Sequence, residues 1–111
     1  MSRHTIHVIS HTHWDREWYM PFERHRRRLV TLFDNLLDLM DADPDFRHFH
    51  ADGQIIPLDD YLEIRPQALP RIQKAAAEGR LSIGPWYVLQ DEFLTSGEAN
   101  VRNMALGLKR A

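Results

Sequence analysis

The chain has 111 residues, of which 43% are hydrophobic and 27% charged, with a net charge of −2 and no cysteine. This charge balance gives no electrostatic basis for binding nucleic acid or an anionic membrane surface, and the lack of cysteine excludes disulfides and thiolate metal ligands. No apolar run approaches the roughly 20 residues of a membrane span, and residues 1–10 lack the apolar core of a signal peptide, so we expect a single domain in the cytoplasm.

The first predicted strand, residues 5–10, runs into a segment that holds two imidazoles, two carboxylates and two indoles, His11-Thr12-His13-Trp14-Asp15-Arg16-Glu17-Trp18. The two-residue period of a strand sends His13 and Asp15, with His11, to one face. Zinc binds imidazole nitrogen and carboxylate oxygen, and a catalytic site keeps one position open for water or substrate. His13 and Asp15 are therefore candidate ligands of half a metal site. The alternative is an ordinary solvated or hydrogen-bonded histidine at a strand end.

The two tryptophans of this segment belong either to the core or to a binding site. A large apolar side chain near a strand end indicates either the core or a binding cleft. Trp14 is predicted to pack in the core. Trp18 fits the core and the wall of a ligand site equally well, and it is our candidate for contact with a ligand ring.

A long helix is predicted next, over residues 22–40. Pro21 precedes it, where a first-turn proline is tolerated, and Asp43-Pro44 closes it. The apolar positions that recur at helical spacing are Leu29, Phe33, Leu36, Leu37 and Met40. The basic run at residues 24–28 is interpreted as the polar face of this helix, and nucleic-acid binding there is the weaker alternative.

A second short strand is predicted over residues 46–51, and it would deliver Asp52-Gly53-Gln54 to the same sheet edge as the His13 segment. Two-residue alternation places His48 and His50 on one face of this strand. We expect them to be wall or solvent histidines. They are not favoured as metal ligands.

Two helices and a third strand follow. The helices are predicted over residues 57–64 and 69–78, the second with Gly79 as its C-cap. The strand is predicted over residues 81–84 and leads to Pro85-Trp86-Tyr87 and then Gln90-Asp91-Glu92. Three βα units in succession predict a parallel sheet with right-handed crossovers. Ligands bind beyond the carboxyl ends of such strands, where all three motifs fall.

The last predicted helix covers residues 96–111. Thr95 and Glu98 have the spacing of a capping box, and Val101, Met104 and Leu108 form an apolar stripe. No cap or returning strand follows to cover the surroundings of this stripe. The chain is therefore expected to be the N-terminal piece of a larger domain.

Four motifs, in order and spacing, resemble glycoside hydrolase family 38, the alpha-mannosidases, and specifically the bacterial branch that includes mannosylglycerate hydrolases. They are the segment 11–18, Asp52-Gly53-Gln54, Ile83-Gly84-Pro85-Trp86-Tyr87 with Gln90-Asp91-Glu92, and Ser96-Gly97-Glu98 with Val101-Arg102-Asn103. The resemblance covers essentially the whole chain. It implies an α/β fold in which residues 1–111 form the first three βα units of a parallel seven-stranded β/α barrel, truncated.

The resemblance further implies that His13 and Asp15 bind a zinc ion and that Trp18 stacks against the sugar of an alpha-mannoside. Co²⁺ or Mn²⁺ would also suit a site of nitrogen and oxygen ligands. The family is retaining, with an aspartate nucleophile and a second carboxyl group as acid and base. These groups, and the remaining zinc histidine, occur farther along in the family. The chain is thus expected to be inactive without the missing C-terminal remainder.

Two carboxylates have open assignments. Asp52 is a candidate for substrate binding through a sugar hydroxyl, or for bracing the turn at Gly53, which we favour. Asp91, with Glu92, is expected to line the cleft, where acid or base work is an alternative to substrate binding. A different hypothesis for the whole chain is a non-catalytic metal- or sugar-binding remnant or interaction module. Its exposed third strand would then pair with another chain or form a homo-oligomer.

Overall fold

The computed structural model describes residues 3–111 and has an α/β fold. Along residues 3–111 it forms, in chain order, β1 (Ser10–His11), α1 (Phe22–Ala42), β2 (Phe49–His50), α2 (Ile56–Ile64), the 3-10 turn η1 (Pro66–Ala68), α3 (Leu69–Ala77), β3 (Leu81–Ser82) and α4 (Gly97–Arg110). Within residues 3–111, no helix combines the length and apolar character needed to cross a membrane.

The three strands form one parallel sheet in the order β1-β2-β3, as the succession of βα units predicts. Phe49 of β2 lies opposite Ser10 of β1 and opposite Leu81 of β3. A further parallel bridge between Gln54 and Trp86 continues the pairing beyond the strands. The carboxyl ends of all three strands therefore open on one edge of the sheet.

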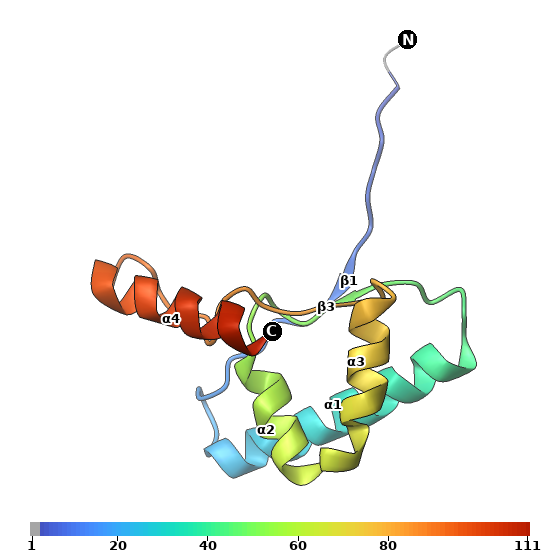
Figure 1. Cartoon of the computed structure of the whole chain (residues 1–111), viewed down its shortest axis with the longest axis horizontal. Helices are drawn as coiled ribbons and strands as arrows, with labels where there is room; N and C mark the ends of the chain where they lie inside the picture. The colour runs from blue at the N-terminus through green and yellow to red at the C-terminus, as the bar shows by residue number, and fades with distance from the viewer. Residues whose placement is uncertain (1–2) are drawn as a thin grey trace.

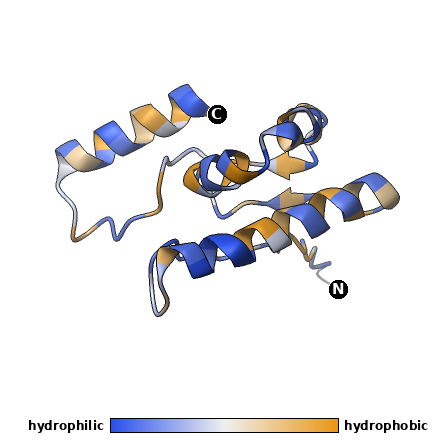
Figure 2. Cartoon of the chain, turned by 90° about the horizontal axis from the view of Figure 1, so that it is seen from below, coloured by the Kyte–Doolittle hydropathy of each residue, from blue (hydrophilic) through white to orange (hydrophobic). Residues whose placement is uncertain are grey.

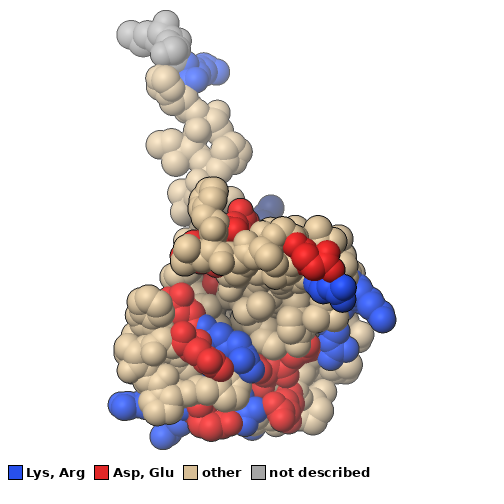
Figure 3. Space-filling view, turned by 90° about the vertical axis from the view of Figure 1, so that its left-hand side faces the viewer, with Lys and Arg blue, Asp and Glu red and all other residues tan. Residues whose placement is uncertain are grey.

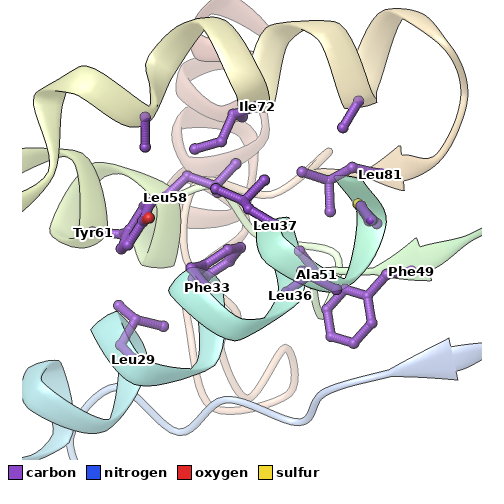
Figure 4. Close-up of a cluster of buried hydrophobic side chains, with 13 residues drawn as sticks. Leu29, Phe33, Leu36, Leu37, Phe49, Ala51, Leu58, Tyr61, Ile72 and Leu81 are labelled. Atoms are coloured by element: carbon purple, nitrogen blue, oxygen red, sulfur yellow. The ribbon is translucent and has the colours of Figure 1, made fainter. Parts of the chain in front are cut away.

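The core lies between the sheet and α1, α2 and α3, which gather on one side of the strands (Figure 1). All five apolar positions predicted for α1 are buried. Figure 4 shows Phe33 of α1 among leucines of α1 and α2 and beside Tyr61, whose ring centroid lies 5.1 Å from that of Phe33. Figure 2 shows the first half of α1 as a hydrophilic stretch, which corresponds to the arginine run at residues 24–28.

The strands are shorter than predicted. Residues 5–9 are not in a strand, and Ile6 and Val8 are 85% and 91% exposed. Figures 1 and 3 show this segment standing away from the body of the molecule. Alternation favours a strand only when one face packs on another layer, and no helix of residues 3–111 covers Ile6 or Val8. The predicted strands 46–51 and 81–84 are likewise reduced to two residues each.

The helix ends also correct the prediction in detail. Ser96, and not Thr95, caps α4, because the Ser96 hydroxyl accepts a hydrogen bond from the Ala99 amide at 3.1 Å. Glu98 is ion-paired with Arg102 and does not return to the cap. In α3 the C-cap is Glu78, followed by a left-handed glycine, and the turn η1 before α3 was not predicted.

The apolar stripe predicted on α4 is largely exposed, at Val101 and Leu108 above all. The buried residue of this helix is Gly107. The helix rests against the segment after β3 through its small residue, because a glycine lets two backbones approach closely. Figure 3 shows basic and acidic side chains interspersed on one face of the body.

Candidate functional site

Three segments that follow the strands line one open hollow of about 640 Å³. They are residues 13–18 after β1, Gln54 after β2, and residues 88–91 after β3. The structure therefore brings His13, Asp15, Trp18 and Asp91 to the same depression. The sheet places them there because parallel neighbours have their carboxyl ends at one edge.

His13 and Asp15 form the closest pair of potential metal ligands in this hollow. Nε2 of His13 lies 3.4 Å from Oδ1 of Asp15, and the side chains are 71% and 48% exposed. Two ligands bound at roughly 2.0–2.2 Å to a tetrahedral zinc ion stand about 3.4 Å apart, by geometry from those bond lengths. The separation of the pair and its access to solvent both fit a shared metal ion.

The pair alone is too small to make a complete ligand set. Across residues 3–111 there is no group of three or more His, Cys, Asp or Glu side chains arranged to hold a metal ion. Structural zinc sites have four ligands and catalytic ones usually have three from protein. His11 hydrogen-bonds through Nδ1 to the Thr12 carbonyl and is exposed, so its predicted place beside His13 brings no third ligand.

Asp52 lies beside the pair and is held by the Trp14 backbone and the Gln54 side chain. Its Oδ2 accepts hydrogen bonds from the Trp14 amide at 2.6 Å and from Nε2 of Gln54 at 2.9 Å. Its Oδ1 lies 3.5 Å from Nδ1 of His13. Asp52 itself has a left-handed backbone, with φ of 59°, as asparagine and aspartate tolerate in turns. These contacts agree with the bracing interpretation, and the substrate-binding role of Asp52 stays a prediction.

The two tryptophans differ in burial. Trp14 is partly buried and packs against the hydrophobic core, and its ring centroid lies 5.8 Å from that of His25. Trp18 is 74% exposed and lines the hollow. A flat apolar surface of this kind, open to solvent beside charged groups, suits stacking against a sugar ring.

Arg16 anchors the segment 13–18 to α2. Its guanidinium donates two hydrogen bonds to the buried Asp60, from Nε at 2.7 Å and from the terminal nitrogen at 3.1 Å, and lies over the Phe22 ring. The hydrogen bond with Asp60 is the main reason that the pKa of Arg16 is raised above its usual value. Paired contacts of this kind fix orientation as well as position.

The wall formed by residues 88–91 is held by α4. Asn103 donates from Nδ2 to the Val88 carbonyl at 2.6 Å and accepts at Oδ1 from the Val88 amide at 2.9 Å. A Cβ atom placed on Gly107 would stand 2.0 Å from the Pro85 carbonyl oxygen, so α4 lies directly on this backbone. Asp91 is exposed on the hollow, and its carbonyl accepts from the Leu94 amide.

Several residues of the site were given no role in the sequence analysis. Gln54, Asp60 and Asn103 each hold a segment that is distant along the chain. Gln54 belongs to a motif quoted above, and its burial beside Ile55 and Ile56 is the signal that it needs partners. His48, expected to be a wall or solvent histidine, is exposed and contacts the Gly79 carbonyl and the Ser82 hydroxyl.

Comparisons with known proteins agree with the arrangement of these motifs. The family model "Glycosyl hydrolases family 38 N-terminal domain" matches residues 3–111. The chain is 62% identical over 105 residues to the "Putative mannosylglycerate hydrolase" of Halalkalibacterium halodurans, a match that covers 95% of this chain and 12% of that protein. It is 35% identical over 107 residues to human Alpha-mannosidase 2C1, which covers 96% of this chain and 10% of the human protein.

Among solved structures, the chain is similar to the crystal structure of an alpha-mannosidase from Enterococcus faecalis V583. The TM-score is 0.89 and the sequence identity 56%, over 92% of this chain and 12% of that one. The chain thus spans about an eighth of the length of such relatives or less.

Proposed function

The chain belongs to glycosyl hydrolase family 38, and from this premise we propose that it supplies the N-terminal part of the catalytic domain of a zinc-dependent retaining alpha-mannosidase. In this proposal residues 1–111 are the first three βα units of a seven-stranded β/α barrel. The observation that carries it is the His13–Asp15 pair, 3.4 Å apart, in one hollow with Trp18. The mannosylglycerate-type substrate named for the bacterial relative makes an alpha-mannoside with a small acidic aglycone our first choice of substrate.

His13 and Asp15 would hold the zinc ion in this proposal. A bound zinc would act as a Lewis acid that grips sugar hydroxyls and stabilises the charge that develops on the ring. Two exposed ligands with open space before them leave coordination positions for the substrate and for ligands from outside residues 1–111. Co²⁺ or Mn²⁺ would satisfy the same donors.

Trp18 would place the sugar ring, and Asp91 would hydrogen-bond to its hydroxyl groups from the opposite wall. Both side chains reach the hollow from segments that the structure fixes at their bases, through Arg16 on one side and Asn103 on the other. Asp52 would act on His13 and would not need to touch the sugar. Holding the substrate between two fixed walls lowers the entropy cost of the reaction.

The covalent chemistry would come from residues outside 1–111. No Asp-x-Phe-Gly segment occurs in the sequence, so no carboxylate described above is assigned as the nucleophile or as the acid and base of a retaining mechanism. The proposal therefore predicts that residues 1–111 alone do not hydrolyse mannosides. Within residues 1–111, the side chains of the site would bind and orient the substrate.

The test is a calorimetric zinc titration of the chain, with His13→Ala and Asp15→Ala as site variants and His48→Ala as the matched control. We expect each site variant to lose more affinity than the 10- to 100-fold typical of removing a supporting residue, and His48→Ala to keep the affinity of the unchanged chain. Equal losses from all three variants would contradict the assignment. No zinc binding by a folded chain would mean that the site exists only when the later ligands are present, and the same variants are then compared in the full-length protein.

The catalytic part of the proposal needs the full-length protein. The same variants, assayed on an alpha-mannoside, should lose most activity at His13 and Asp15 and little at His48. A full-length protein that binds zinc and mannoside tightly but releases no mannose would instead support a non-catalytic sugar-binding role.

A further inference from the structure

A second depression, smaller than the hollow at the strand ends, adjoins the candidate metal pair. It has a volume of about 110 Å³ and is called the side pocket below. Both depressions are lined by His13, Trp14 and Asp15, and the side pocket is completed by Tyr19, His25 and Arg28. A group bound in the side pocket would therefore lie next to a sugar bound in the hollow.

Arg28 brings a cation to the side pocket. Along residues 3–111 its side chain has no ion pair, and its Nη1 donates a long hydrogen bond of 3.5 Å to the Tyr19 hydroxyl. Arg26, on the same helix α1, is instead paired with Glu23 and Glu63. A guanidinium has five N–H donors, so most of those on Arg28 remain for a ligand.

Tyr19 places a hydroxyl group beside this guanidinium. Its ring packs edge-on against the ring of His25, with the centroids 5.5 Å apart and the planes at 86°. His25 is buried, and its Nδ1 lies 3.3 Å from the Arg16 carbonyl oxygen. The Tyr19 ring is thus packed on α1, although most of its surface is exposed. A tyrosine hydroxyl that accepts from an arginine can still donate its own hydrogen to an anion.

These donors define the chemistry of a ligand for the side pocket. A planar guanidinium beside a hydroxyl donor suits a carboxylate or a phosphate group, which can accept two hydrogen bonds at once. A divalent cation held by His13 and Asp15 would strengthen the attraction, because its charge exceeds that of the single Asp15 carboxylate. The pocket is much smaller than the hollow, which suits one compact group.

We propose that Arg28, with the Tyr19 hydroxyl, forms a specificity-determining subsite for an acidic group, a carboxylate or a phosphate, carried by the alpha-mannoside whose sugar lies in the hollow. That the ligand is a mannoside rests on the proposed function. Binding of the acidic group needs neither a sugar nor hydrolysis, so it is measured independently of that function.

The alternative is that Arg28 is an ordinary solvated arginine on the polar face of α1. This alternative predicts no preference for an acidic ligand and equal effects of replacing Arg28 or Arg27. Arg27 is exposed next to Arg28 in the chain and does not line the side pocket. Arg27→Gln is therefore the matched control for Arg28→Gln, because it removes the same charge from the same helix.

The first experiment measures anion binding by the full-length protein in the presence of zinc. It is titrated calorimetrically with D-glycerate, with inorganic phosphate, and with glycerol as the uncharged reference. At least one anion should bind more tightly than glycerol. Arg28→Gln should weaken the binding of that anion about 10- to 100-fold, the usual value for a hydrogen bond to a charged group, and Arg27→Gln should keep it. Binding of neither anion, or equal losses in the two variants, would overturn the proposal.

The second experiment measures specificity in hydrolysis and separates the two sources of the acidic group. Methyl alpha-mannoside is the neutral reference for an alpha-mannoside with a carboxylate on its aglycone and for one with a phosphate on its sugar. Arg28→Gln should lower the ratio of kcat/KM for one acidic substrate to that for the neutral one by about 10- to 100-fold. Arg27→Gln should keep this ratio.

The two experiments fail in different ways. An unchanged ratio in Arg28→Gln would overturn the subsite and leave the proposed function standing. A full-length protein that hydrolyses none of these mannosides would contradict the proposed function, and the calorimetric titrations would then decide whether the anion subsite stands.

Tyr19→Phe tests the second donor. This variant keeps the ring against His25 and removes only the hydroxyl group. It should weaken the binding of the same anion by less than Arg28→Gln does, because a neutral donor contributes less than a charged one. An anion affinity equal to that of the unchanged protein would overturn the part of Tyr19 in the subsite.

Discussion

The hollow at the strand ends and the hollow between α2, α3 and the end of α4 have similar volumes, about 640 and 500 Å³, but opposite construction. The first is lined by loop residues that hydrogen bonds hold in place, through Gln54, Asp52 and Asn103. The second is lined mostly by aliphatic residues, Leu58, Leu62, Leu69 and Ile72 of the packed helices together with Ile55 before α2 and Ile83 after β3. Polar residues that can bind a ligand thus lie on the loops, whereas the packed helices supply the apolar contacts that stabilise the fold.

This separation means that the two regions should respond differently to mutation. Changes in the packed helices α1, α2 and α3, called the helical region below, should lower the free energy of unfolding in proportion to the apolar volume removed. Changes in the site should cost less stability and act on binding. The following variants are ordered from the largest expected change in the free energy of unfolding to the smallest.

Phe33→Ala should have the largest effect. The Phe33 side chain is fully buried beside Tyr61, and truncating a buried phenylalanine costs about 3–5 kcal/mol. Urea unfolding followed by circular dichroism measures the change. The control, Leu39→Ala on the exposed side of α1, should cost about 1 kcal/mol or less. If Phe33→Ala lowered the free energy of unfolding no more than Leu39→Ala, the buried residues around Phe33 would not form the core.

Tyr61 gives the helical region a pH dependence. Burial, with a hydrogen bond to Asp34, raises the pKa of Tyr61 to about 12. The pKa of Tyr61 is higher in the folded state than in the unfolded state. Its contribution to the free energy of unfolding is therefore complete below the unfolded pKa, near 10, and is lost as the pH rises to about 12. The loss should be roughly 2 to 3 kcal/mol. Tyr61→Phe should remove this part of the alkaline decline, and an unchanged decline would contradict the assignment.

Gly107→Ala should strain the contact between α4 and the site. The new Cβ would meet the Pro85 carbonyl oxygen at 2.0 Å, and overpacking of this kind costs about 1–3 kcal/mol. The Val88 amide, held by Asn103, should also exchange faster with solvent. Gly97→Ala is the matched control on the same helix, because nothing lies within 4 Å of a Cβ there. Equal effects at the two glycines would mean that α4 does not rest on this segment.

Ser96→Ala should cost about 1 kcal/mol, the usual value for loss of a helix N-cap. The Ser96 hydroxyl accepts from the Ala99 amide, whereas Thr95 hydrogen-bonds to the Asn100 side chain. Thr95→Ala should therefore cost less than Ser96→Ala in thermal unfolding. The reverse order would restore the capping box that the sequence predicted.

Trp18→Ala should change stability least, by under about 0.5 kcal/mol, because the side chain is mostly exposed. In the full-length protein, a calorimetric titration with an alpha-mannoside should show weaker binding, and the zinc titration described above should show no release of zinc. Loss of zinc or of the fold in this variant would assign Trp18 to the structure and remove the sharpest contrast between the two regions.

The sequence was most informative where a pattern is local. The apolar spacing of α1 predicted its buried face, and the helix differs from the prediction only by two residues at its end. The order of strands and helices predicted the parallel sheet, and with it the shared edge where His13, Trp18 and Asp91 meet. These features follow from periodicity and connectivity, which are written in consecutive residues.

Strand lengths and the α4 cap were less predictable, because neighbouring residues offer competing solutions. Ser96 and Thr95 are both favourable N-cap residues, and the backbone path after residue 91 decides between them. Ile6 and Val8 alternate as in a strand, but their burial depends on a layer that the described residues do not provide.

The network of the site was decided by tertiary structure alone. Gln54 contacts Trp14 and Leu89, 40 and 35 residues away along the chain, and Arg16 contacts Asp60, 44 residues away. The sequence by itself determined which chemical groups are present and at which sheet edge they emerge. Which nitrogen faces which carboxylate depends on hydrogen bonds that exist only after distant segments have met, because a buried polar group takes its partners from whatever the fold brings within about 3 Å.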